Sequence, residues 1–308
     1  MSQSPPDYDA VRRAVTAWYA MNGRQFLWRR ENPDPYVALV AEVMLQQTQT
    51  ARVAEKLPRF LEQFPDFAAL AAASNAAIIR AWQGFGYNNR ALRLRDCARA
   101  VMERFGGELP DNQAALASLP GVGRYTAAAL QAFVFHRDTA VLDVNVRRVY
   151  SRVFGAMTLS TDALPEAEIA AVSEVIFPRG RASAWHQAVM DVGAMFCKAR
   201  RTDCAACPLA GVCRSAFEIH PIVRARRPEP SRFGTPNRVW RGRATEALRK
   251  LPHGAQLTER EVFAAVAERA PNQEDAAWFA ALLDALERDG IIAITPGADG
   301  ERRVALRE

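Results

Sequence analysis

Two acidic residues stand where a carboxyl group could take part in chemistry. Glu42 lies within the apolar run of residues 40–45, and Asp143 separates the apolar residues 141–142 from a basic helix that includes residues 146–149. Glu42 is either a solvent-facing helix acid or a desolvated carboxyl group that holds a proton and donates it. Asp143 is either a helix N-cap or a group kept charged for catalysis.

A glycine-rich turn precedes Asp143. Residues 119–123 read Leu-Pro-Gly-Val-Gly, with a short helix expected before them and an amphipathic helix over Thr126–Phe135 after them. Gly121 and Gly123 can adopt conformations closed to other residues and leave no side chain between the backbone and a ligand. Backbone N–H groups and a helix N-terminus aimed outward make an anion site that suits a phosphate. The alternative is a plain connector between two helices.

Polar and aromatic side chains surround the helix that carries Glu42. Gln46 and Gln47 follow it and offer neutral hydrogen-bond donors and acceptors, as expected of side chains inserted into a nucleic-acid duplex. The loop before the helix, residues 22–35, contains Trp28, Arg29 and Arg30. Trp28 is either a packing residue or, beside the two arginines, a wall of a binding pocket.

Four of the five cysteines crowd into residues 197–213, and Cys97 stands alone. The four, Cys197, Cys204, Cys207 and Cys213, are spaced so that only one Cys-x2-Cys pair occurs, with a flanking cysteine on each side. In a reducing compartment this crowding indicates a metal site rather than disulfides. Zinc is the generic alternative, but most zinc sites pair two Cys-x2-Cys motifs. The cysteine cluster therefore predicts a centre bound by four thiolates.

Together these motifs resemble a large superfamily of DNA glycosylases. The turn at residues 119–127 followed by Asp143 is similar to its helix–hairpin–helix plus Gly/Pro-Asp signature. The run EVMLQQTQ at residues 42–49 resembles the catalytic helix of MutY-type adenine DNA glycosylases. The cysteine spacing matches the [4Fe–4S] loop of the endonuclease III and MutY families, which favours an iron–sulfur cluster over zinc.

The resemblance implies a role for each matching residue. Glu42 would be the general acid, Asp143 the carboxylate near the sugar, and Gln46 and Gln47 would contact DNA. The turn at residues 82–90 resembles the family's GLGYY(A/S)R turn, in which Tyr87 would wedge into the base stack. Tyr125 and Asn145 match family residues that hold the extruded nucleotide.

The chain also departs from the family pattern. Phe26 and Leu27 replace the leucine and proline of the family's LPW segment, so the assignment of one pocket arginine between Arg29 and Arg30 stays open. Asn88 stands where the family has a second tyrosine. Nothing after residue 236 resembles the Nudix-like domain of longer relatives, which indicates a short form of the family.

Tyr125 stands where bifunctional endonuclease III enzymes carry a lysine nucleophile. A lysine there forms a Schiff base and cuts the DNA backbone, which tyrosine cannot do. The resemblance therefore implies a monofunctional enzyme.

Bulk composition agrees with a globular protein that has an anionic partner. The 308 residues carry a formal net charge of +6, and all but three of the 40 basic residues are arginine. Arginine suits phosphates and base edges, although a GC-rich genome would produce the same bias. No run is long and apolar enough for a membrane span, and no signal peptide is visible. We expect a cytoplasmic, nucleoid-associated bacterial monomer that binds double-stranded DNA and no membrane.

Periodicity predicts a mostly helical fold. We expect a helix–hairpin–helix glycosylase domain over residues 1–222, with two helical modules separated by a cleft, and a linker over residues 223–236. Residues 237–308 should form a winged-helix-like module. Its predicted elements are helices over Arg238–Leu251, Glu259–Arg269 and Asp275–Arg288 and a hairpin of Ile291–Thr295 with Arg302–Leu306.

The expected function is removal of mispaired adenine from DNA, with Glu42 and Asp143 meeting in one crevice that accepts the extruded base. A thymine or uracil mismatch glycosylase of the same superfamily is the nearest alternative. A non-catalytic DNA-binding iron–sulfur protein is the alternative from another class. The residues leave open whether the opposite base is 8-oxoguanine or guanine, and what residues 237–308 do.

Overall fold

Residues 7–222 form helices joined by turns. The computed structural model describes residues 7–222, 228–267 and 272–308. Up to residue 222 the elements are α1 Tyr8–Asn22, η1 Leu27–Arg29, α2 Pro35–Leu45, α3 Thr50–Gln63, α4 Phe67–Ala72, α5 Asn75–Ala81, α6 Asn89–Phe105, α7 Gln113–Ala117, α8 Arg124–Phe133, α9 Val144–Phe154, α10 Glu166–Ile176, α11 Ala182–Met195 and η2 Ala210–Val212.

The remainder of the chain adds helices and short strands. In order these are β1 Ser231–Arg232, β2 Thr235–Pro236, α12 Asn237–Arg249, β3 Leu257–Thr258, α13 Glu259–Ala267, α14 Gln273–Arg288, β4 Ile292–Pro296 and β5 Arg302–Leu306. Residues 223–227 of the expected linker, and residues 268–269 of the expected helix Glu259–Arg269, lie outside the described residues.

Local sequence explains where many of these helices begin. The side chains of Asp66, Ser74 and Asn112 each accept a hydrogen bond from the backbone N–H three residues on, which caps α4, α5 and α7. Asn272 and Asp275 form a capping box at the start of α14. Short polar side chains therefore set these helix starts.

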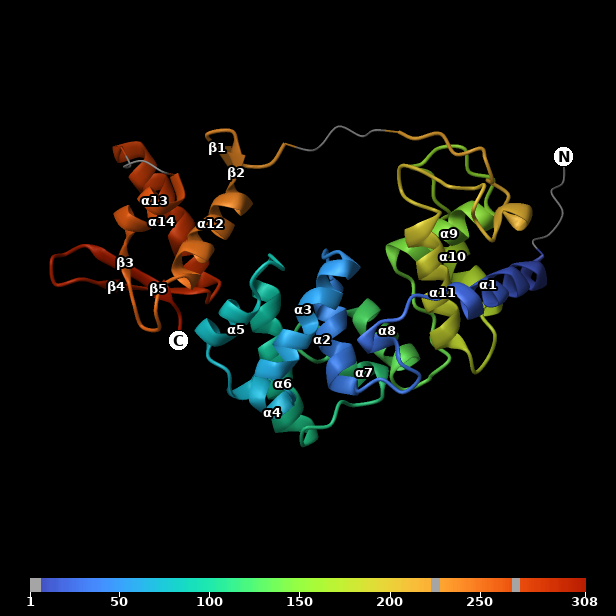
Figure 1. The fold of residues 1–308 in the computed structure, drawn as a ribbon, viewed down its shortest axis with the longest axis horizontal. Helices are drawn as coiled ribbons and strands as arrows, with labels where there is room; N and C mark the ends of the chain where they lie inside the picture. Colours follow the sequence, from blue (N-terminus) through green and yellow to red (C-terminus); the bar gives the residue numbers. More distant parts are fainter. Residues whose placement is uncertain (1–6, 223–227, 268–271) are drawn as a thin grey trace. The chain divides into compact units, whose positions relative to one another are not determined.

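The chain divides into two compact units. The first comprises Met1–Leu39, Pro110–Ser118 and Val122–Ala225, and the second comprises Val40–Leu109, Leu119–Gly121 and Arg226–Glu308. In the first unit α9 packs on α10 and α11, and α11 also contacts α1 and α8 (Figure 1). Trp185 and Tyr150 lie in this core, where the indole Nε1–H donates to the phenol oxygen at 2.8 Å.

The second unit contains a helical part and the C-terminal elements. α4 and α5 both pack on α6, and α12, α13 and α14 pack on one another (Figure 1). A three-stranded antiparallel sheet in the order β3-β5-β4 completes the C-terminal part. The predicted hairpin is confirmed as β4 and β5, whereas β3 was not predicted. The described residues form no helix long and apolar enough to cross a membrane.

Candidate active site

Glu42 lies near the end of α2, in the second unit. Its exposed fraction is 8%, and Leu39, Val40, Ala41 and Met44 around it on the helix are completely buried. The solvent-facing alternative is therefore excluded, and Glu42 sits in the largely dehydrated environment expected of a proton donor.

The residues after α2 form a sharp turn. Gln47 has a φ of 58°, in the left-handed region that residues other than glycine rarely adopt. Its side chain is exposed, whereas Gln46 is half-buried. Such strained conformations persist where the surrounding structure holds them, and they are common at ligand-binding sites.

Tyr87 occupies a second strained turn in the same unit. Its φ is 45°, and 58% of its surface is exposed. A large aromatic ring held out from a turn is free to stack on another planar group. This exposure agrees with a wedge and excludes a tyrosine packed in the core.

Arg90, at the start of α6, ties these two turns together. Its guanidinium donates to acceptors on both, namely the backbone carbonyls of Val43, Met44, Gln46, Phe85 and Gly86 and the Thr48 hydroxyl. It also lies over the rings of Trp82 and Tyr87. Burial lowers the pKa of Arg90 from its usual value. Sequence reasoning assigned no role to Arg90, because its acceptors are carbonyl groups that leave no trace in residue types.

Asp143 in the first unit caps α9. Its Oδ1 accepts from the Val146 backbone N–H at 2.7 Å, and its Oδ2 accepts from the Asn145 amide at 2.7 Å. The N-cap interpretation is therefore correct, but it does not exclude that Asp143 is also a charged group used in catalysis. A cap held at both oxygens is also a carboxylate of fixed orientation, which catalysis near a developing cation requires.

Asn145 connects Asp143 to the cysteine-containing loop. Its Oδ1 accepts from Arg148 Nη2 at 2.6 Å, and the same guanidinium donates to the Gly193 carbonyl at 2.9 Å and, through Nε, to the Cys197 carbonyl at 2.6 Å. Burial lowers the pKa of Arg148 from its usual value. The chain Asp143–Asn145–Arg148–Cys197 was not predicted from the sequence.

Gly193 allows α11 to approach α9 at this point. A Cβ atom on Gly193 would lie 2.7 Å from the Asn145 Cβ, which real Cβ atoms essentially never do. Any larger residue would push Asn145 away, and with it the amide that orients Asp143. A glycine within a long apolar helix is the sequence signal that could have revealed this contact.

The glycine turn has the predicted local form. Gly121 has a φ of 78°, and a Cβ atom there would come within 3.2 Å of the Arg93 Cβ. Gly123 is the N-cap of α8, and Gly123 and Arg124 are exposed, whereas Thr126 and Ala127 of the same turn are buried. Tyr125 on that turn is 37% exposed. The turn thus presents both a helix N-terminus and the phenol ring.

Trp28, Arg29 and Arg30 lie in the loop before α2, and each has a different environment. Trp28 is buried and stacks on Phe26 with ring centres 4.8 Å apart. Arg29 pairs with Asp191 at 2.9 Å, and Arg24 pairs with the same carboxylate at 2.6 Å. Arg30 is exposed. Sequence reasoning missed Asp191, although a single acid in the apolar run of α11 could have signalled it.

The four clustered cysteines line one small, largely apolar cavity in the first unit. Arg152 Nη1 donates to Cys197 Sγ at 3.4 Å, and the Phe217 backbone N–H donates to Cys204 Sγ at 3.4 Å. Burial raises the pKa of Cys207 and of Cys213 to about 11. Within the described ranges, no three His, Cys, Asp or Glu side chains are grouped so as to hold a single metal ion. A donor set of four cysteines around one cavity, with N–H groups aimed at sulfur, fits a thiolate-bound group.

Comparison with known proteins identifies the class. The sequence model of the HhH-GPD superfamily base excision DNA repair proteins matches residues 40–174, a stretch that begins before Glu42 and ends after Asp143. The chain has a mostly helical fold like that of endonuclease III. A structure of a non-covalent endonuclease III–DNA complex matches with a TM-score of 0.58 and 25% identity over 70% of this chain and 97% of that chain. A structure of a thermostable thymine-DNA glycosylase matches with a TM-score of 0.62 and 28% identity over 68% of this chain and 96% of that chain.

Two mycobacterial relatives indicate the family within this superfamily. The adenine DNA glycosylase of Mycobacterium tuberculosis (strain CDC 1551 / Oshkosh) is 35% identical over 249 residues, which cover 80% of this chain and 81% of that protein. The adenine DNA glycosylase of Mycolicibacterium smegmatis is 33% identical over 295 residues, 94% of each chain. The chain therefore belongs to the HhH-GPD superfamily of base excision repair proteins and, within it, to the adenine DNA glycosylase family.

Proposed function

We propose that this protein extrudes mispaired adenine from duplex DNA and hydrolyses its N-glycosidic bond without cutting the backbone. Its membership of the adenine DNA glycosylase family makes it a DNA N-glycosylase of base excision repair. The single observation that carries the mechanism is the pair of acids within the stretch that the family model matches. One of them, Glu42, is buried, and the other, Asp143, is oriented by two N–H donors.

Each acid has a distinct part in the reaction. The bond between C1′ and the adenine nitrogen breaks with its electron pair leaving on the base, and Glu42 donates a proton to an adenine ring nitrogen. The sugar develops oxocarbenium character, as in glycoside hydrolysis, and Asp143 stabilises that positive charge. Water then adds to C1′, its proton returns to the Glu42 carboxylate, and an abasic site is left. In this proposal both acids act on the same extruded nucleotide.

Other residues of the site would hold the substrate. Tyr125 and Asn145 contact the extruded nucleotide, while Gly121 and Gly123 present backbone N–H groups to a phosphate. Gln46, Gln47 and Tyr87 enter the stack left behind. Extrusion costs a few kcal/mol and costs less at a mispair, which favours mismatched adenine over paired adenine. Either 8-oxoguanine or guanine could stand opposite the excised base.

The cysteine loop would hold a [4Fe–4S] cluster through Cys197, Cys204, Cys207 and Cys213. Such a cluster, when bound, joins the four thiolates into one rigid body and so crosslinks residues 197–213. Arg148 and Arg152 then anchor that loop to α9 through the Cys197 carbonyl and Sγ. Lys198, Arg200 and Arg201 are exposed on the same loop and would meet DNA phosphates.

We further propose that residues 1–222 form the glycosylase domain, residues 223–236 a linker, and residues 237–308 a winged-helix-like module. The order α12-β3-α13-α14-β4-β5, with β5 between β3 and β4, supports this assignment for the last part.

A thymine or uracil mismatch glycosylase is the second candidate. The similarity to the thymine-DNA glycosylase structure favours it. Glu42 with Gln46 and Gln47 favours adenine, because departure of a purine is assisted by protonation of its ring nitrogen.

Base release from a set of duplexes, each with one defined mispair, distinguishes the two candidate functions. We expect adenine release from A·8-oxoguanine and A·G duplexes and none of thymine or uracil from T·G and U·G duplexes. Release of thymine or uracil without adenine would show that the protein is a mismatch glycosylase for pyrimidines. DNA binding without release of any base would favour a non-catalytic protein.

Borohydride treatment tests the monofunctional assignment. No lysine stands at position 125 to form a Schiff base, so we expect no efficient covalent trapping of the enzyme on cleaved DNA. Trapping comparable to that of an endonuclease III control would contradict it.

A further inference from the structure

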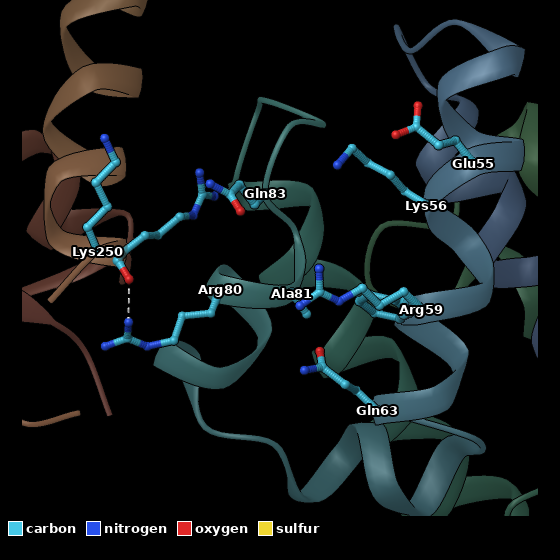
Figure 2. Close-up of a pocket in the computed structure, with 10 residues that line it drawn as sticks. Glu55, Lys56, Arg59, Gln63, Arg80, Ala81, Gln83 and Lys250 are labelled. Carbon is cyan, nitrogen blue, oxygen red and sulfur yellow. Dashed lines mark hydrogen bonds between the residues drawn. The ribbon is translucent and has the colours of Figure 1, made fainter. Parts of the chain in front are cut away.

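A basic hollow of about 460 Å³ lies in the second unit, outside the residues assigned to the reaction. α3 forms one side, the end of α5 and the turn after it form the middle, and the end of α12 forms the other side (Figure 2). The lining residues are Glu55, Lys56, Arg59, Phe60, Gln63, Arg80, Ala81, Gln83, Arg249 and Lys250. Five of the ten are cationic and one is acidic. Two of the chain's three lysines are among them.

The arginines on the α5 and α12 sides hold the hollow in shape. Arg80 Nη1 donates to the Arg249 carbonyl at 2.6 Å and to the Leu251 carbonyl at 2.9 Å, the first of which Figure 2 shows. Arg249 Nε donates to the Ile79 carbonyl at 2.9 Å in return. The acceptors of Arg80 are neutral carbonyl groups, so its charge is not neutralised, whereas Arg249 also pairs with the Glu246 carboxylate at 3.2 Å. Together the two side chains join α5 to α12.

The other three cations are available to a ligand. Lys56 and Arg59 extend from α3, and Lys250 lies on the opposite side of the hollow (Figure 2). Within the described part of the chain no carboxylate lies within 4 Å of the charged groups of these three residues. The nearby Glu246 is already engaged, since it accepts from Gln83 and from Arg249. An unneutralised cluster of this density attracts a polyanion.

The hollow shares a turn with Tyr87. Gln83 lines the hollow, and a Cβ atom on Gly84 would lie 3.0 Å from Lys56 Cε, so the turn packs directly on that lysine. At the other end of the turn, Asn88 Oδ1 accepts from Arg249 Nη2 at 2.8 Å. Residues 83–88 therefore connect the exposed tyrosine to both walls of the basic hollow.

We propose that this hollow binds backbone phosphates of the same duplex into which Tyr87 inserts, so that α12 extends the DNA contact beyond the lesion. The inference rests on the proposed function, which supplies the duplex. Lysine and arginine side chains around an open hollow suit phosphodiester oxygens. Lys250 gives residues 237–308 a direct part in DNA binding.

A salt titration of DNA binding tests this inference. The double variant K56E/K250E is compared with the control R13E/R104E, which makes the same change in net charge at exposed residues of α1 and α6 that do not line the hollow. Both are made in a D143N background and titrated with a 30-base-pair duplex that contains one A·G mispair. Each lost phosphate contact lowers the slope of log Kd against log salt by about 0.9.

We expect K56E/K250E to bind at least tenfold more weakly than the parent at low salt and to lose about two units of slope. The control should stay within threefold of the parent. Equal losses in the two variants, or an unchanged slope in K56E/K250E, would overturn the inference. Circular dichroism of both variants confirms that the helices are intact.

Two further measurements remove the alternatives. In the first, inorganic phosphate is titrated into the parent protein. If phosphate binds at the hollow while the salt slope of DNA binding is unchanged in K56E/K250E, the hollow is a site for small anions and not for DNA. With Asp143 restored, K56E/K250E should need at least tenfold more enzyme than the wild type for half-maximal single-turnover adenine release, and R13E/R104E should not. Absence of release from the wild-type protein would refute the proposed function, whereas the salt slopes would still decide the hollow.

Discussion

The guanidinium of Arg90 lies 5.8 Å from the centre of the Tyr87 ring, while its N–H groups donate to the backbone carbonyls that precede Gln47 and Tyr87 in their two turns. One side chain thus holds Gln47 and Tyr87 in left-handed conformations that neither residue favours alone. The two turns are separated by about forty residues in sequence and act as one surface.

Replacement of Arg90 should disorganise that surface. Arg90→Lys keeps the charge but loses the planar fork that reaches several carbonyls, which removes hydrogen bonds worth about 1 kcal/mol each. We expect a lower melting temperature and at least tenfold weaker binding to an A·G duplex. Arg93→Lys, on the same helix, serves as the control. Binding and melting equal to wild type in Arg90→Lys would show that the turns are held by other contacts.

Two substitutions of Asp143 separate its role as the cap of α9 from its proposed role as a catalytic carboxylate. Asparagine caps helices as well as aspartate, whereas alanine costs about 1 kcal/mol at an N-cap. We expect Asp143→Asn to lose at least a thousandfold in the rate of adenine release while its stability and DNA affinity stay near wild type. Asp143→Ala should lose the activity and also stability. Single-turnover kinetics and thermal melting check both, and an active Asp143→Asn would remove the carboxylate from the mechanism.

Arg148 should affect the reaction without touching the substrate. Its substitution by glutamine removes the bonds to the Asn145 amide oxygen and to the carbonyls of Gly193 and Cys197. We expect at least tenfold slower adenine release in Arg148→Gln, because Asn145 no longer holds Asp143 in place. Arg137→Gln loses only an exposed ion pair with Asp111, typically worth under about 1 kcal/mol, and should react at the wild-type rate. Restoration of the rate by Arg148→Lys would show that charge alone suffices.

His186 makes stability depend on pH. Burial lowers its pKa to about 4, and its Nε2 accepts from the Val141 backbone N–H at 3.3 Å. The unfolded chain takes up a proton near pH 6.5 and the folded one only near pH 4, so the free energy of unfolding should fall as pH drops through that window. The shift corresponds to about 3 kcal/mol. Denaturant melts of His186→Gln should lose this component, and those of the exposed His136→Gln should keep it.

Residues that are neighbours in sequence could be interpreted from the sequence alone. The spacing of Cys197, Cys204, Cys207 and Cys213 places four thiols on one short loop, and the structure places them around one cavity. Helices with regular apolar spacing were predicted closely, as the expected helix Asp275–Arg288, observed as α14, shows, because periodicity is a local property. The turn around Gly121 was recognisable for the same reason, because a positive φ favours glycine.

Contacts between residues that are distant in sequence could be found only in the tertiary structure. Arg29 meets Asp191 across 162 positions of sequence, and Arg148 meets Cys197 across 49. The basic hollow joins Lys56 to Lys250, which no spacing relates. A guanidinium that binds carbonyl groups is indifferent to the identity of the residues that carry them. Residue type and spacing therefore predicted the chemistry of the site, and only the packing of the chain determined which side chains hold it in place.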